Sequence, residues 1–296
     1  DATDKDAGDY AQRVKIYYLS EADNPPPTRH LDATEKSYNC LPYYNYTFFQ
    51  DINDVVQNNP IRRQDKAMVS LLKGLGIEKG KPFEPTERQR KAMHEGLLLA
   101  YASMQNYFVT PGKCMEPLWK DESGKPKSQW LFWLFAPGQP EAGFTHETET
   151  EVLVDDRAAK YFYVTYLPKY LGGGTFYLTG LFDSDGNKLD GTSTYKLNVP
   201  KDTPAKDFWS VIVYSMETKN FVQGAKRVGL SSRNAGTMQV NEDGSYDVYF
   251  SPKAPEGKES NWIPTGEDFF LLFRLYGPDG KDWFKTWMLG DLEKVK

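Results

Sequence analysis

The feature that most constrains the fold is a series of short, strand-like segments in the second half of the chain, separated by turn-forming residues. These segments are rich in aromatic and β-branched residues, which pack well on a pleated surface. They are Gln129–Phe135, Thr175–Phe182, Thr194–Val199, Trp209–Tyr214, Tyr246–Phe250 and Phe269–Tyr276. Turn residues follow several of them, as at Asp183–Asn187 and Gly277–Gly280. Many strands with little helix between them predict an antiparallel, jelly-roll-like β-sandwich over residues 111–296.

Two further pairs of strands are predicted in this region. Met238–Val240 and Tyr246–Phe250, joined by the turn residues 241–244, indicate a β-hairpin. Val152–Val154 and Tyr161–Tyr166 indicate two strands joined by Asp155-Asp156-Arg157. That connection is either a turn with a local ion pair or a pair of catalytic acids.

Residues 37–110 show a helical period instead. An apolar stripe at helical spacing begins at Phe48 and ends before Pro60, and a second helix runs from about Arg63 to Leu75. Thr86 with Gln89 three residues later is the pattern of a capping box and opens a third helix. We therefore predict a mainly β protein with a small helical subdomain in front of the sandwich.

Residues 1–36 lack long periodicity. They are predicted to form an extended connector from an N-terminal domain that this chain lacks, with one short strand at Arg13–Leu19. No signal peptide is visible.

Charge and hydropathy exclude two classes of partner. The net charge is −5, and no long basic stretch is present, which argues against nucleic acid. The apolar runs are far shorter than the roughly 20 residues of a membrane-spanning helix. Cys40 and Cys114 either pair in an oxidising compartment or remain inert thiols. A periplasmic or secreted location is favoured over a cytoplasmic one.

Sequence motifs of common enzymes are absent, so candidates for catalysis rest on carboxylates. If Glu147, Glu149 and Glu151 lie on an extended strand, they share one face, because strand side chains alternate. Three clustered carboxylates suit Ca²⁺, and Glu147 and Glu149 could also act as acid and base. The alternative is a solvated strand face. No other cofactor is expected.

Arg274 is the candidate for ligand binding, because it lies in an otherwise apolar strand. A guanidinium there must be paired or reach water. It either clamps an anion beside Tyr276 and Trp262, or forms a structural ion pair that holds the loop Asn261–Pro264. Four tryptophans form either a stacking platform for flat ligands or part of the core: Trp209, Trp262, Trp283 and Trp287. The predicted ligand-binding set is Trp209, Asn261, Trp262, Arg274 and Tyr276, with Arg274 also a candidate for orienting a substrate anion.

Several motifs resemble a known family. Phe208-Trp209-Ser210 followed by Tyr214, Asn261-Trp262-Ile263-Pro264, and Arg274 with Tyr276 and Pro278 resemble the bacterial domain of unknown function 1214. Residues 76–83 resemble the linking region that follows the companion domain 1254. The resemblance implies a jelly-roll-like fold and a further domain before this chain, and it implies no established reaction.

Three functions remain open. The first is a binding or assembly module that recognises a glycan or a small organic ligand, or that forms an oligomer with the missing domain. The second is a hydrolase or lyase acting on a carbohydrate-like or carboxylated substrate. The third is a structural subunit. The aromatic content of 15% and the lack of nucleophile motifs favour the first.

Overall fold

The computed structural model describes residues 4–30, 43–113, 115–133, 146–162, 174–280 and 282–295. The chain forms two units, residues 1–38 and residues 39–296. Cys40 and Cys114 lie outside the described residues, as does most of the predicted strand Tyr161–Tyr166.

The first unit contains the helix α1 (Asp4–Ala11) and the short 3-10 helix η1 (Leu19–Glu21). The strand predicted at Arg13–Leu19 is wrong. Instead of pairing with a strand, the backbone of Ile16 exchanges hydrogen bonds with the hydroxyl of Thr28 at 2.8 and 3.3 Å. An alternating pattern forms a strand only where a second strand supplies partners.

The predicted helical subdomain is built from α2 (Tyr46–Asn58), α3 (Lys66–Leu72) and α4 (Glu87–Val109). The 3-10 turns η2 (Arg63–Asp65) and η3 (Lys73–Leu75) flank α3. Gly76 ends this segment with φ of +85°, a conformation that glycine adopts at little cost. The three helices bury one apolar cluster, made of Phe49, Val56, Ile77, Met93 and Leu97. Among the described residues, no helix is long and apolar enough to cross a bilayer.

The capping box predicted at the start of α4 is confirmed. The Thr86 hydroxyl accepts from the Gln89 backbone N–H at 3.3 Å, and Gln89 Oε1 accepts from the Thr86 backbone N–H at 2.8 Å. Two backbone donors that the helix leaves unpaired are thus satisfied.

Thr86→Ala is expected to lower the free energy of unfolding by about 1 kcal/mol, because it removes the capping oxygen. Urea denaturation followed by circular dichroism measures the change. Thr86→Ser, which keeps the hydroxyl, is the matched control. Equal losses in both variants would show that the cap is not the cause.

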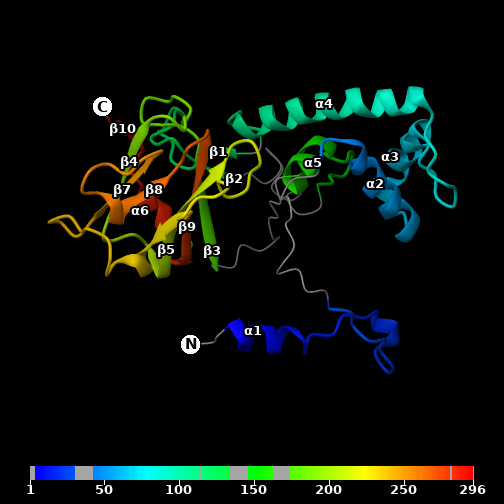
Figure 1. The fold of residues 1–296 in the computed structure, drawn as a ribbon, viewed down its shortest axis with the longest axis horizontal. Helices are drawn as coiled ribbons and strands as arrows, with labels where there is room; N and C mark the ends of the chain where they lie inside the picture. Colours follow the sequence, from blue (N-terminus) through cyan, green and yellow to red (C-terminus); the bar gives the residue numbers. More distant parts are fainter. Residues whose placement is uncertain are drawn as a thin grey trace. The chain divides into compact units, whose positions relative to one another are not determined.

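The described residues from 115 onwards form ten strands in two sheets (Figure 1). The six-stranded sheet has the order β1 (Met115–Pro117), β2 (Trp130–Trp133), β3 (Thr175–Gly180), β9 (Phe269–Pro278), β5 (Ala205–Ser215) and β6 (Gly229–Ser231). The four-stranded sheet has the order β10 (Glu293–Val295), β4 (Thr194–Val199), β7 (Tyr246–Ser251) and β8 (Trp262–Pro264). Neighbouring strands are antiparallel, except β7 and β8, which are parallel. The predicted mainly β fold is confirmed.

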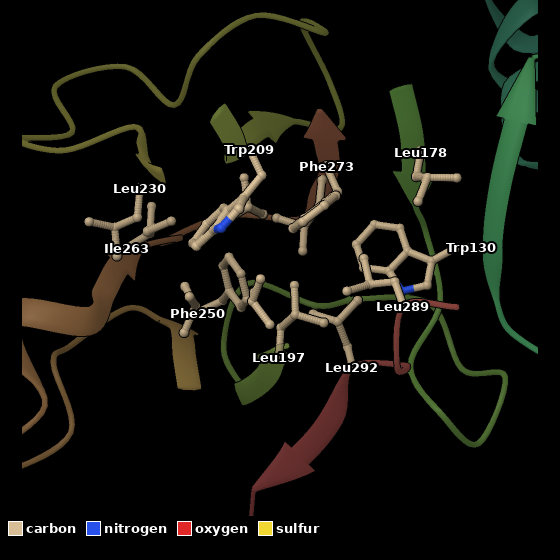
Figure 2. Close-up of a cluster of buried hydrophobic side chains, with 14 of the residues drawn as sticks. Trp130, Leu178, Leu197, Trp209, Leu230, Phe250, Ile263, Phe273, Leu289 and Leu292 are labelled. Atoms are coloured by element: carbon tan, nitrogen blue, oxygen red, sulfur yellow. The ribbon is translucent and has the colours of Figure 1, made fainter. Parts of the chain in front are cut away.

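The sandwich core lies between the two sheets (Figure 2). β5 and β9 contribute Trp209 and Phe273, whose rings stack at 5.8 Å. The opposite sheet contributes Leu197, Phe250 and Ile263, all with no exposed surface. The short helix α6 (Trp283–Thr286) closes the core with Trp283, which is 5% exposed.

A second apolar cluster lies on the other face of the six-stranded sheet. Phe108, near the end of α4, packs against Phe270 of β9 with ring centroids 5.0 Å apart. Ala159 of α5 (Val154–Phe162) and Leu181 belong to the same cluster. α4 therefore contributes to two cores, the helical one through Met93 and Leu97 and this one through Phe108.

Two strand predictions in the sandwich region are wrong. Val152–Val154 leads into the helix α5, because Asp155 and Asp156 stabilise the N-terminal end of a helix. Met238–Val240 forms no strand. There the side-chain amide of Asn261 pairs with the backbone of Gln239, donating at 2.8 Å and accepting at 2.7 Å, in the way a neighbouring strand would. The turn that follows is present, closed by Asn241 N–H to Ser245 C=O.

Candidate functional site

The candidate site lies on the outer face of the six-stranded sheet, beyond the part that Phe108 covers. Along β9, Phe273 and Leu275 point into the sandwich, so Arg274 and Tyr276 point outward. The register places Tyr177 of β3 and Ser210 of β5 opposite Arg274, and Phe208 of β5 opposite Tyr276. Arg274 is thereby surrounded by aromatic side chains from both neighbouring strands.

Tyrosines hold the guanidinium of Arg274 in place. Nη2 of Arg274 donates a hydrogen bond to the hydroxyl of Tyr214 on β5. The guanidinium carbon lies 5.2 Å from the centroid of the Tyr177 ring and 5.8 Å from that of Tyr214, within the range of cation–π attraction. Burial raises the pKa of Tyr177, and the neighbouring hydroxyl of Tyr276 raises it further.

The guanidinium of Arg274 has a hydrogen-bond donor that the described residues leave unused. Nε of Arg274 is buried and has no hydrogen-bond partner among the residues that the structure describes. In the part of the chain that the structure describes, no carboxylate lies within 4.0 Å of Arg274, so the predicted structural ion pair with the loop at Asn261–Pro264 is not found there. A buried guanidinium donor without an acceptor is costly, and an anionic ligand could supply the acceptor.

A second arginine lies near the same face. Phe208 stacks on Tyr276, with ring centroids 4.1 Å apart and planes at 15°. The guanidinium of Arg233, on the 3-10 helix η5 (Ser232–Asn234) after β6, lies 4.0 Å from the centroid of Phe208. The side chains can bind an anion and a flat group, and none of them is a strong base or nucleophile.

The other predicted ligand-binding residues lie elsewhere. Trp209 is 5% exposed and packs in the sandwich core. Asn261 is 2% exposed, and its amide is used in bonds to Gln239 and Asp247. Ile263 points into the core from the four-stranded sheet, so the preceding Trp262 points away from it, with Nε1 bonded to the Ser251 carbonyl at 2.9 Å. Trp262 and Arg274 therefore lie on opposite outer faces and do not share a groove.

The four tryptophans predicted as a possible stacking platform do not lie together on one surface. Trp283 and Trp287 pack together, with ring centroids 5.7 Å apart, and Trp283 belongs to the sandwich core. Together with the burial of Trp209, this favours the core as the role of these residues.

The three glutamates do not lie on one face of a strand. Glu147 bridges to Val152, and Thr148 N–H donates to the Glu151 carbonyl at 2.9 Å, so the segment turns back on itself. Glu147, Glu149 and Glu151 are all exposed. Within the described ranges, no group of three His, Cys, Asp or Glu side chains could hold a metal ion.

A buried polar cluster lies next to this turn. Nδ1 of His146 is 2.7 Å from Oδ2 of Asp156, and Lys160 forms an ion pair with the other oxygen of Asp156. His146 is 4% exposed and Lys160 is 1% exposed. The spacing of four residues between Asp156 and Lys160 on a helix was the only signal in the sequence for this cluster.

Comparisons with known proteins add a family match. Residues 174–280 match the DUF1214 family model, described as a protein of unknown function. No curated protein matches the chain.

Two of the similar solved structures are compared with this chain. The VPA0106 protein of Vibrio parahaemolyticus is 20% identical with a TM-score of 0.42, and the alignment covers 100% of this chain and 67% of that one. An uncharacterized protein from Burkholderia cenocepacia is 17% identical with a TM-score of 0.31, covering 43% of this chain and 32% of that one. These likenesses are too low to support an argument about function.

The DUF1214 segment contains all the residues of the outer-face site: Tyr177, Phe208, Tyr214, Arg233, Arg274 and Tyr276. Four of these were not predicted as site residues, because they come from β3, β5 and η5. Alternation within one strand placed Arg274 and Tyr276 together. Only the register between strands brings the other four to them.

A cleft of about 370 Å³ lies between α4 and the loops that follow β5 and precede β9. α4 lines it with Tyr101 and Gln105, and the sandwich lines it with Met216, Glu217, Glu267 and Asp268. Lys219 contacts two of the lining residues. Its Nζ donates to Gln105 Oε1 at 2.6 Å and to the Met216 carbonyl. Burial lowers the pKa of Lys219 to about 8.

Lys219 is expected to make stability depend on pH. Its pKa is about 8 in the folded chain and about 10.4 when unfolded, so between these values the unfolded state binds more protons. The free energy of unfolding therefore rises with pH across this window. We expect the wild type to gain on the order of 2 kcal/mol relative to Lys219→Met between pH 8 and pH 10.4.

Urea denaturation of both proteins at several pH values from 7 to 10.5 measures this difference. Lys226→Met removes an exposed lysine and serves as the control. If the profiles of wild type and Lys219→Met run parallel, the burial of Lys219 does not perturb its ionisation.

Proposed function

We propose that the sandwich is a binding module for a small organic anion, which it holds on the outer face of the six-stranded sheet. The observation that carries the proposal is the buried Nε of Arg274, which no described residue pairs with. A carboxylate next to it would accept charge-assisted hydrogen bonds, each worth about 1.5–3 kcal/mol. The ligand thus supplies the acceptor that the described side chains do not.

The surroundings of Arg274 support an organic ligand over a bare ion. Tyr177 and Tyr214 flank the guanidinium, and Tyr177 is 39% exposed, so a ligand can reach its ring. Aromatic rings bind the flat faces of sugars and of aromatic molecules through apolar contact. An acidic sugar or an aromatic acid would satisfy both parts of the site.

Matched pairs of ligands test the proposal. Isothermal titration compares benzoate with benzamide and D-galacturonate with D-galactose, each pair differing in the carboxylate. We expect the acids to bind and the neutral partners to bind at least tenfold more weakly. Arg274→Gln is expected to weaken binding of the acids by about 10- to 100-fold, as the loss of one charged hydrogen-bonding group predicts.

Arg88→Gln is the control for net charge, because Arg88 is an exposed arginine on α4. It should leave binding unchanged. Equal affinities for acids and neutral partners, or for wild type and Arg274→Gln, would contradict the proposal.

A further inference from the structure

The outer-face site has a second cation whose position suggests a longer ligand. The inference rests on the proposed function, because it takes Arg274 as the first anion contact. Arg233 is exposed and stacks on Phe208, which in turn stacks on Tyr276. A continuous row of side chains therefore joins Arg274 and Tyr276 on β9 to Arg233 beyond β5.

Neither guanidinium is neutralised by the described part of the protein. No carboxylate lies within 4.0 Å of Arg233 or of Arg274 there. Two acids lie near the ends of β5 and β9: Asp279 pairs with Lys206 at 3.7 Å, and Asp207 lies beside Gly277. The two arginines thus leave a positive, aromatic-lined row in a chain whose net charge is −5.

The sheet geometry sets the distance between the two cations. Arg274 lies on β9, and Arg233 follows β6, two strands away through β5. Phe208, on which Arg233 stacks, is two residues from the position opposite Arg274. With strands about 4.8 Å apart and a rise of about 3.4 Å per residue, the separation is on the order of 10 Å.

We propose that this face binds an elongated organic dianion, with one carboxylate at Arg274 and the other at Arg233. The flat or apolar spacer between the carboxylates contacts the rings of Tyr276 and Phe208. A ligand with a single carboxylate uses Arg274 alone. Recognition by both arginines selects for length as well as for charge.

Three biphenyl acids test this ligand class by isothermal titration with the full chain. Biphenyl-4-carboxylate has one carboxylate, biphenyl-4,4′-dicarboxylate has two at opposite ends, and biphenyl-2,2′-dicarboxylate has two close together. We expect the 4,4′ acid to bind about tenfold more tightly than the mono acid, and the 2,2′ acid to show no such gain. The two diacids carry equal charge, so the comparison isolates spacing.

Three variants locate the effect. Arg233→Gln is expected to abolish the tenfold gain and leave binding of the mono acid unchanged, whereas Arg274→Gln weakens binding of all three. Arg233→Lys keeps the charge and should retain part of the gain. Circular dichroism and the melting temperature check that each variant is folded.

The outcomes separate the two proposals. If the mono acid binds through Arg274 but the 4,4′ acid binds no more tightly, the dianion inference is wrong and the proposed function stands. The same holds if the 2,2′ acid gains equally, or if Arg233→Gln keeps the full gain. If the mono acid fails to bind, the proposed function falls and the inference falls with it.

Discussion

Trp209→Ala is expected to lower the free energy of unfolding by about 3–5 kcal/mol. The side chain is 5% exposed and stacks on Phe273 in the centre of the sandwich, so alanine leaves a cavity between the sheets. A loss of this size is a large part of the 5–15 kcal/mol that typically stabilises a folded domain. Urea denaturation followed by tryptophan fluorescence and circular dichroism measures it.

Two further variants distinguish a core role from a ligand-binding role. Trp209→Phe keeps most of the apolar volume and should recover much of the lost stability. Trp262→Ala, on the outer face of the four-stranded sheet, is expected to cost less because Trp262 is only partly buried. If Trp209→Ala left stability unchanged and affected only ligand binding, the core assignment would be wrong.

Gly191→Ala is the second substitution with a large expected effect. A Cβ at this position would lie 2.1 Å from the carbonyl oxygen of Glu267 and 2.6 Å from its Cα. The neighbour is backbone and cannot rotate away. The two loops are also held together, with the Thr265 hydroxyl donating to the Gly191 carbonyl at 3.1 Å. We expect a loss of about 3 kcal/mol or more, the upper end of the cost of overpacking.

Gly236→Ala is the matched control for that substitution, because nothing lies within 4 Å of its Cβ position. Its free energy of unfolding should stay within about 0.5 kcal/mol of the wild type. Thermal and urea denaturation of both variants give the comparison. Similar stabilities for the two would show that the loops at Gly191 can separate without cost.

The main strands and helices could be predicted because their signals are local. Alternation marks β4, a continuous apolar run marks β9, and the capping residues mark the start of α4. The three-residue strands β1, β6, β8 and β10 carry no period of their own and exist only through their partners. Val152–Val154 was misassigned because a short apolar run fits a strand and a helix start equally well.

The site was predictable only in part, because most of its residues meet through pairing between strands and not through a local pattern. Arg274 and Tyr276 are two residues apart on one strand, so alternation alone puts them on one face. Trp262 lies in the four-stranded sheet, and no local pattern states which sheet a strand joins. Phe208 and Tyr177 reach Arg274 through pairing across about 70 and 100 residues of sequence, which periodicity does not encode.

The double role of α4 bears on how this chain can be dissected. At about 1.5 Å per residue its 23 residues span about 35 Å, so its two ends lie in different apolar clusters. A fragment that begins at residue 111 lacks Phe108 and exposes the ring of Phe270 beneath it. A fragment limited to residues 174–280 also lacks β1, β2 and β10, leaving sheet edges open to aggregation. The segment that defines the family match is thus smaller than the segment that can be expected to fold. Expression of the sandwich should retain α2, α3 and α4, so that both clusters stay covered.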